Sequence, residues 1–190
     1  MRRLQIPAIL MAVWVSTYAG PALAQSFAEE DRDWGIAPQE RIRGAPYTAR
    51  TPSSIPGAKV IATRELRALV EAGAGSEPGN RPLLVDVASG DGHATLPGAI
   101  WIPGAGRGTS FVDPLQAQFM DLMSKLTGGD KTRALVFLCV NVQCWLSYNA
   151  ALRAVAAGYT RVSWYRGGIA SWRDAGLPLA VITLATGSAE

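Results

Sequence analysis

The side chains best suited to chemistry in this sequence are two cysteines, Cys139 and Cys144, which lie five positions apart. Cys139 directly follows the apolar run 134–138, and Cys144 precedes a segment with helical spacing. A thiol between a strand end and a helix N-terminus lies where the helix dipole stabilises its nucleophilic thiolate. The loop amides can also turn inward and bind an anion. Cys139 could thus attack a sulfur donor and carry the product as a persulfide, although a buried core thiol is the structural alternative.

The two cysteines could also react with each other. A loop of this size can close a strained disulfide, and strained exposed bridges are the labile kind. In that chemistry Cys139 is the reactive thiol and Cys144 the resolving partner, whereas the alternative is that Cys144 only packs beside Trp145. We expect the substrate to contact the loop made by Val140, Asn141, Val142, Gln143 and Trp145.

Metal chemistry is not expected. His93 is the single histidine, which excludes metal sites that need two imidazoles, and two cysteines cannot complete a structural zinc site without other ligands. We expect no cofactor either. His93 could serve as a base, but we favour a turn in which it satisfies backbone groups. Asp86 ends an apolar run, where it could orient the cysteine loop or hold an arginine, and we favour a structural role.

Strands and helices alternate along the chain. Thr63 and the pair Asp113-Pro114 suit helix starts. Buried apolar runs joined by helices are typical of an α/β fold with a mainly parallel sheet, whose ligands bind outside the carboxyl ends of the strands. The expected strands are 59–62, 82–87, 99–103, 134–138 and 162–165, and the expected helices are 64–72, 115–126, 148–157 and 170–175.

The first residues resemble an export signal. Arg2 and Arg3 precede the apolar stretch 4–18, and small residues at Ala22 and Ala24 predict cleavage after Ala24. An uncleaved membrane anchor is the alternative. We expect a periplasmic protein with no stable membrane anchor after cleavage. The chain then divides into a signal peptide, an extended arm, one folded domain and a tail, at residues 1–24, 25–57, 58–182 and 183–190.

Composition narrows the classes of partner. The chain has 190 residues, of which 48% are hydrophobic and 17% charged, and this is enough apolar material for a folded core. The formal net charge is +3, and without Arg2 and Arg3 it falls to +1, with 16 basic and 15 acidic side chains. Such a balance gives no reason to expect nucleic acid as a partner. In the arm, Trp34, Ile36 and Tyr47 could anchor the chain to the domain, and disorder is the alternative.

Two stretches of the domain carry recognisable motifs. The first is Leu84-Val85-Asp86-Val87, His93, Leu96-Pro97-Gly98-Ala99-Ile100 and Ile102-Pro103, and the second is Gly158-Tyr159, Val162, Gly167-Gly168-Ile169, Trp172 and Ala175-Gly176-Leu177-Pro178. These stretches resemble the opening and closing signatures of rhodanese-like domains. The resemblance runs from about Lys59 to Leu179. It implies an α/β fold with helices on both faces of the sheet, and it puts Cys139 where that family keeps its catalytic cysteine.

A narrower resemblance concerns the cysteine loop. Cys144-Trp145 and the residues around it are similar to the CXXCW-motif proteins associated with pyrroloquinoline quinone (PQQ)-dependent alcohol catabolism. This implies a periplasmic PQQ-dependent oxidation system as partner, besides a small sulfur-containing or anionic substrate. Active sulfurtransferases of the broader family carry an arginine in this loop, which here has none. Arg107, Arg161 and Arg166 are the candidates to replace its charge, and each could equally be solvated surface.

The sequence is therefore consistent with two functions. The first is sulfane-sulfur transfer or thiol–disulfide exchange at Cys139. The second is a catalytically inactive rhodanese-like binding module for a periplasmic partner or ligand, in which the cysteine pair is a structural bridge. The missing loop arginine favours the second function, and the thiol at the strand end favours the first.

Overall fold

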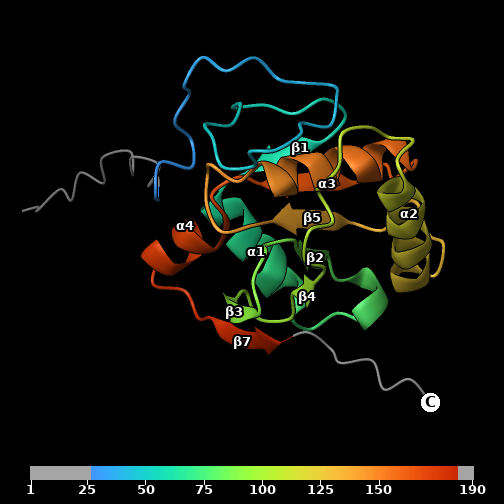
Figure 1. Ribbon diagram of the computed structural model, residues 1–190. Coiled ribbons are helices and arrows are strands. Elements are labelled where there is room, and N and C mark those ends of the chain that lie inside the picture. The colour runs from blue at the N-terminus through green and yellow to red at the C-terminus, as the bar shows by residue number, and fades with distance from the viewer. Residues whose placement is uncertain (1–26, 184–190) are drawn as a thin grey trace, which may run out of the picture.

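The computed structural model describes residues 27–183. The expected signal peptide and its cleavage site after Ala24 lie outside the described residues, as do residues 184–190 of the expected tail. Within the described part, a five-stranded parallel sheet has the order β1-β6-β5-β2-β4 (Figure 1). Its strands are β1 (Lys59–Ile61), β2 (Leu83–Asp86), β4 (Ile100–Trp101), β5 (Leu135–Leu138) and β6 (Val162–Tyr165).

Helices cover both faces of this sheet. Helices α2 (Pro114–Thr127) and α3 (Trp145–Ala156) pack on one face, and α1 (Thr63–Gly73) and α4 (Gly168–Asp174) pack on the other. Alternate residues of β5 supply the two cores, because successive side chains of a strand point to opposite faces. A short 3-10 helix at Pro78–Asn80 follows α1. The expected α/β fold with a mainly parallel sheet and helices on both faces is confirmed.

Two helices begin earlier than their apolar spacing predicts. Helix α3 starts at Trp145 rather than at residue 148, and α4 starts at Gly168 rather than at residue 170. In α3 the reason is an acceptor from far away in the sequence, because the Trp145 amide donates to the Tyr47 carbonyl at 2.8 Å. That bond satisfies one of the amides that a helix N-terminus leaves without a partner.

A second, two-stranded sheet was not predicted. Strand β3 (Gly92–Thr95) pairs antiparallel with β7 (Ala180–Thr183), so that Thr183 belongs to a strand rather than to the expected tail. His93 pairs with Ile182 in this ladder. The short segment 92–95 carries glycine and polar residues in place of an apolar run, so it gives no strand signal.

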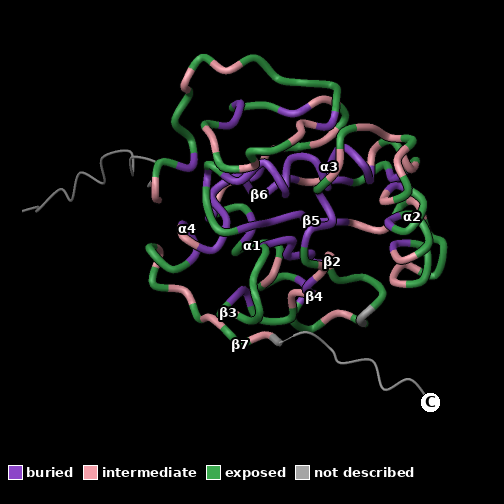
Figure 2. The backbone as a smooth tube through the Cα atoms, in the orientation of Figure 1, coloured by how far each residue is buried: buried purple, intermediate pink, exposed green. Residues whose placement is uncertain are grey.

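Residues 27–57 form an extended segment, which we call the arm, and it packs along α3 (Figures 1 and 2). The Tyr148 hydroxyl accepts a hydrogen bond from the Gln39 amide and donates one to the Gln39 carbonyl, at 2.8 and 2.9 Å. The Asn149 side chain likewise bonds both backbone groups of Arg43. The suggested anchors Trp34, Ile36 and Tyr47 all contact the domain.

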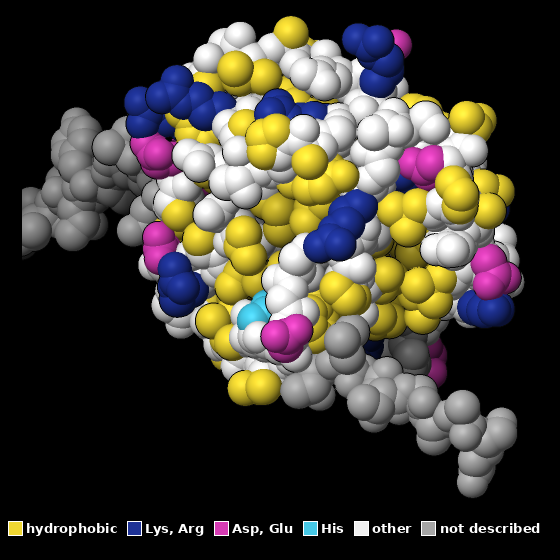
Figure 3. All heavy atoms as spheres, viewed as in Figure 1, with side chains coloured by type: hydrophobic (Ala, Val, Ile, Leu, Met, Phe, Trp, Pro, Cys, Tyr) yellow, Lys and Arg dark blue, Asp and Glu magenta, His cyan; other side chains and the backbone are white. Residues whose placement is uncertain are grey.

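The surface carries no dominant charge on the side seen in Figure 3. Lys, Arg, Asp and Glu side chains are scattered there, and apolar and uncharged groups lie between them. Among the helices of residues 27–183, none combines the length and the hydropathy that a bilayer crossing requires.

Candidate functional site

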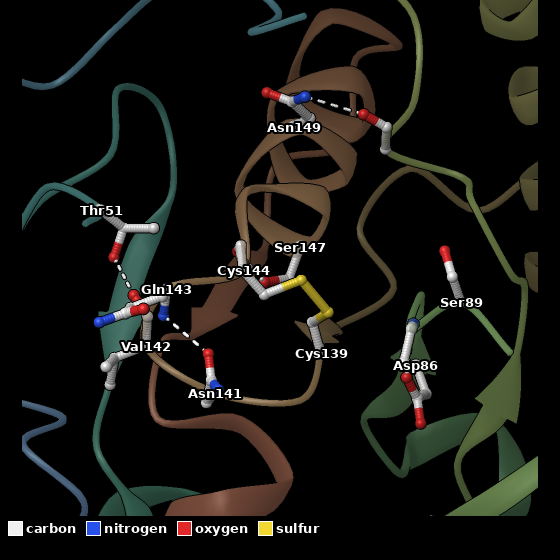
Figure 4. The surroundings of a disulfide bond; sticks show 12 residues. Thr51, Asp86, Ser89, Cys139, Asn141, Val142, Gln143, Cys144, Ser147 and Asn149 are labelled. Atoms are coloured by element: carbon white, nitrogen blue, oxygen red, sulfur yellow. Dashed lines mark hydrogen bonds between the residues drawn. A yellow bond between two sulfur atoms is a disulfide. The ribbon is translucent and has the colours of Figure 1, made fainter. Parts of the chain in front are cut away.

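The two cysteines form a disulfide at the carboxyl edge of the sheet (Figure 4). Cys139 follows β5, and Cys144 is the N-cap residue of α3. Their Cα atoms are 6.2 Å apart. Both residues are buried, with 2% of Cys139 and 7% of Cys144 exposed. The arrangement therefore places a disulfide between a strand end and a helix N-terminus.

Helix α4 holds the first half of the cysteine loop. The amides of Ile169 and Ala170 donate to the carbonyls of Cys139 and Val140, each at 2.9 Å. Gly168 permits this approach, because it has φ +61° and an added Cβ would collide with the Cys139 carbonyl oxygen. The backbone that carries Cys139 is thus fixed from the side of α4.

The arm holds the second half of the loop. The Thr51 hydroxyl donates to the Val142 carbonyl at 2.5 Å, and the Ala49 amide donates to the Gln143 carbonyl at 3.0 Å. Thr48 forms an antiparallel bridge with Cys144. The arm therefore runs beside the disulfide and belongs to the site.

Several loop amides are already engaged within the protein. The Gln143 amide donates to the Asn141 side-chain oxygen, and the Cys144 amide donates to the Asn141 carbonyl. The Trp145 amide is bonded to Tyr47. These three amides therefore have partners within the protein and are not free to bind an anion.

A surface hollow of about 460 Å³ opens at the disulfide. Of the loop residues expected to bind substrate, Val140 lies in its wall. Val142 is buried, and Asn141 and Gln143 are exposed. In Figure 4, Val142 and Gln143 lie on one side of the disulfide and Ser89 on the other. The described residues that line the hollow are Tyr47, Thr48, Ser89, Arg107, Cys139, Val140, Cys144 and Leu146.

Trp145 does not belong to the loop. It is the first residue of α3 and is fully buried. Its indole Nε1 donates to the Arg50 carbonyl, and the Arg43 guanidinium lies 4.6 Å above the ring. Trp145 therefore anchors the arm, and it is not among the described residues that line the hollow.

The three candidate arginines have different positions. Arg107 lines the hollow, and its Nη2 donates to the Ser89 hydroxyl at 3.2 Å. Arg166 is 1% exposed and donates to carbonyls of the arm, at Glu30 and Thr51. Arg161 lies at the opposite edge of the sheet, in the wall of another hollow. Only Arg107, of these three, can meet a ligand at the disulfide.

Sequence reasoning missed Tyr47, Thr48, Ser89 and Leu146 as lining residues. A signal existed for Ser89, because it follows β2 and the carboxyl ends of neighbouring parallel strands meet at one edge. Tyr47 and Thr48 had no such signal, because they come from the arm.

Asp86 and His93 form a pair beside the site. Asp86 is fully buried, and its Oδ2 lies 2.6 Å from His93 Nε2. Its Oδ1 accepts the Ala88 amide at 2.8 Å. His93 thus pairs with a carboxylate rather than with the expected backbone groups, and Asp86 orients the segment that leads to Ser89. In residues 27–183 no cluster of three or more His, Cys, Asp or Glu side chains is placed to hold a metal ion.

Comparison with known proteins identifies a family through one family model. A family model described as "Rhodanese-like domain" matches residues 63–175. No curated protein matches the chain.

Solved structures similar to this chain include three from bacteria and yeast. The BH2092 protein of Bacillus halodurans is 21% identical, over 65% of this chain and 75% of that chain, with a TM-score of 0.46. An uncharacterized protein of Saccharomyces cerevisiae is 20% identical, over 63% and 93% of the two chains, with a TM-score of 0.45. Ygr203w, described as a yeast protein tyrosine phosphatase of the Rhodanese family, is 21% identical, over 63% and 87%, with a TM-score of 0.43.

Proposed function

The chain belongs to the rhodanese-like domain family, and we propose that it performs thiol–disulfide exchange through Cys139 and Cys144. Membership supports a sulfurtransferase or thiol-related role at the level of the family. The observation that carries the finer proposal is the disulfide itself, because both of its cysteines line an open hollow. A bridge that served only stability would not need to face a space that a small molecule can enter.

The proposed exchange has two steps. A substrate thiolate attacks Cys139 Sγ, the bond between the cysteines breaks, and Cys144 leaves as a thiolate that then takes a proton. The N-terminus of α3 stabilises that leaving group, and a better leaving thiolate speeds exchange. A second substrate thiol then attacks the substrate sulfur of the mixed disulfide and releases Cys139. Two thiols are oxidised to one substrate disulfide, and the protein disulfide is reduced to two thiols.

Sulfane-sulfur transfer is the second candidate, and the place of Cys139 at the end of β5 favours it. In the reduced protein, the Cys139 thiolate would attack the outer sulfur of thiosulfate. The sulfur–sulfur bond breaks, sulfite leaves, and Cys139 holds a persulfide. Attack by Cys144 on the inner sulfur of that persulfide would release hydrogen sulfide and restore the disulfide.

Mass spectrometry of matched single-cysteine variants tests both candidates. After reduction and incubation with thiosulfate, Cys144→Ser should gain the mass of one sulfur atom on Cys139, and Cys139→Ser should gain none. The wild-type protein should equilibrate between its dithiol and disulfide forms in mixtures of glutathione and glutathione disulfide, whereas structural bridges with potentials below about −300 mV resist that pool. Both candidates would fail if the disulfide stayed oxidised at every ratio of glutathione to glutathione disulfide and if no variant gained sulfur from thiosulfate. The remaining function would then be the inactive binding module.

The cellular setting is part of the same proposal. We place the mature protein in the periplasm with its N-terminus at Gln25, beside a PQQ-dependent oxidation system. The pattern of residues 1–24 and the resemblance of Cys144-Trp145 to the CXXCW motif support this setting. The intact mass of protein taken from a periplasmic fraction checks the export step, and a chain that retains Met1 would refute it.

A further inference from the structure

The loop that carries Arg107 is attached firmly to the helix that carries Cys144. The Gly106 carbonyl accepts a hydrogen bond from Asn149 Nδ2 at 2.8 Å, and the Arg107 carbonyl accepts one from Arg153 Nη2 at 2.6 Å. Asn149 and Arg153 are both fully buried residues of α3. The backbone at Arg107 and the disulfide therefore share one rigid support.

The arm fixes the same loop from another side. The Gly108 amide donates to the Tyr47 hydroxyl at 3.1 Å. Tyr47 also lines the hollow, and its carbonyl accepts the first amide of α3. Arg107 thus projects from a segment that is held by two independent elements at the edge of the hollow.

The guanidinium of Arg107 has no ion pair with an Asp or Glu side chain among the described residues. Its stem lies along Gly104, where an added Cβ would come within 3.1 Å of Arg107 Cδ. Its Nη2 bonds the neutral Ser89 hydroxyl. A charged donor with only a hydroxyl partner can add a carboxylate partner at little cost.

Arg107 is also the one charged side chain among the described residues that line the hollow. No carboxylate there competes for it or repels an anion. The neighbouring amides of Gln143, Cys144 and Trp145 are engaged within the protein. Among the lining residues, Arg107 therefore supplies the charged group that attracts an anion, in addition to the N-terminal end of α3.

We propose that Arg107 selects the thiols that react at this disulfide, and that the favoured thiols carry a carboxylate close to their sulfur. This inference rests on the proposed exchange function. A guanidinium binds a carboxylate through two parallel hydrogen bonds, which orients the ligand as well as holding it. The hollow of about 460 Å³ lies within the range of small-molecule sites. The substrate class is thus small acidic thiols, with the carboxylate on Arg107 and the sulfur at the disulfide.

Three small thiols of different charge test the proposal. The rate of reduction of the disulfide is measured with 3-mercaptopropionate, 2-mercaptoethanol and cysteamine, each expressed per thiolate. Wild type should favour the anionic thiol over the neutral one by at least about tenfold, because even one charge-assisted hydrogen bond contributes that much. Arg107→Gln should remove the preference, and Arg107→Glu should shift it toward cysteamine.

The control is Arg161→Gln, because Arg161 is an exposed arginine at the opposite edge of the sheet. It should keep the wild-type preference. The same ratio of anionic to neutral rates in wild type and Arg107→Gln would overturn the role of Arg107.

A ligand without a thiol separates this inference from the exchange function. Binding of 3-(methylthio)propionate is followed through the arginine side-chain resonances of wild type and Arg107→Gln. Binding that needs Arg107, with no reduction by any thiol, would refute the exchange function and leave Arg107 as an anion site. Reduction without any charge preference or binding would refute the inference and leave the exchange function standing.

Discussion

Gly106 brings two backbones together beside the disulfide. A Cβ at this position would overlap the Leu146 carbonyl oxygen, and Leu146 lies in the first turn of α3. The Gly106 carbonyl in turn accepts a hydrogen bond from Asn149. The missing side chain therefore decides how closely the Arg107 loop can approach the helix.

Replacing Gly106 by alanine should destabilise the protein. The Leu146 carbonyl belongs to the helix backbone and cannot move aside cheaply, so we expect a loss of about 1–3 kcal/mol in the free energy of unfolding. Urea unfolding monitored by tryptophan fluorescence measures it. Gly75→Ala is the matched control, because no atom lies within 4 Å of the added Cβ, and it should change stability by less than about 0.5 kcal/mol. Equal stabilities of the two variants would contradict the argument.

At this scale, the positions of Cys139 and Cys144 could be predicted from the sequence, because each depends on its immediate neighbours. An apolar run followed by a thiol puts that thiol at a strand end. The place of Trp145 could not be predicted, since it depends on Arg43 and Arg50, which are about a hundred positions away. The position of Arg107 could not be predicted either, because the sequence did not distinguish it from the other two candidate arginines, Arg161 and Arg166.

The segment between β4 and α2 is joined to α3 by an ion pair. Asp113 caps α2 by accepting the Gln116 amide at 3.0 Å, and its Oδ2 accepts a hydrogen bond from Arg153 Nη2 at 2.8 Å. The hydrogen bond from Arg153 lowers the pKa of Asp113 to about 2, with smaller help from backbone amides and against the effect of burial. Asp113 therefore stays ionised and fixes the end of the segment that begins at Arg107.

Asp113→Asn should cost about 2 kcal/mol of stability at neutral pH, because the pKa of Asp113 is lowered in the folded protein. A lowered carboxyl pKa stabilises the fold above the unfolded value of 3.8, and that stabilisation is lost as the pH falls toward 2. The difference between wild type and variant should thus shrink from pH 5 to pH 2.5. Asparagine remains a good helix cap, so the start of α2 is preserved.

Thermal unfolding across that pH range measures the effect of Asp113→Asn. The control is Asp121→Asn, which removes an exposed ion pair with Lys125 on the same helix and should cost less than about 1 kcal/mol. A difference for Asp113→Asn that stays constant with pH would show that Arg153 does not hold the carboxylate ionised.

Some helices and strands could be predicted from the sequence, and others could not. The strands of the parallel sheet are short apolar runs, and their burial on both faces makes that pattern visible. Strand β3, with the sequence Gly-His-Ala-Thr, lacks this pattern, and its partner β7 is a short apolar segment that lies far along the chain and outside the central sheet. Helix α3 begins three residues early because its first amide finds an acceptor in the arm, which no local pattern contains.

Across the whole molecule, Thr51 joins three segments that are distant in sequence. Its hydroxyl donates to the Val142 carbonyl and accepts a hydrogen bond from Arg166 Nε at 3.2 Å. Its own carbonyl accepts Arg166 Nη2 at 3.1 Å. Thr51 is fully buried. One hydroxyl thus links the arm, the cysteine loop and the segment between β6 and α4.

Thr51→Val should loosen this junction without changing its volume much. The substitution leaves the buried Arg166 Nε and the Val142 carbonyl without their partner, and an unsatisfied buried group costs about 1–3 kcal/mol. Tm by calorimetry should fall, and hydrogen exchange at Ala49 and Trp145 should become faster. Ser54→Ala, an exposed change in the same arm, should leave both measurements unaltered. Unchanged exchange in Thr51→Val would mean that the arm is held without this hydroxyl.

The arm shows where prediction from sequence stops. Its anchors Trp34, Ile36 and Tyr47 stand out as apolar residues in a polar segment, but the segment has no period that distinguishes packing from disorder. The buried carboxylate of Glu30 gave no signal either. It accepts hydrogen bonds from the amide and hydroxyl of Thr63, and burial raises its pKa.

The bridge between Thr48 and Cys144 also bears on the order in which the chain assembles. Thr51 and Val142 are 91 positions apart, and Phe27 and Ser171 are 144 apart. Contacts of such separation form slowly, because a long loop must close first. The hydrogen bonds of the arm go to α3, to the cysteine loop and to Arg166, so the arm can dock only once those parts of the domain have formed. Until it docks, the newly formed cysteine pair faces its surroundings without Tyr47 and Thr48, so oxidation of the thiols can precede completion of the site.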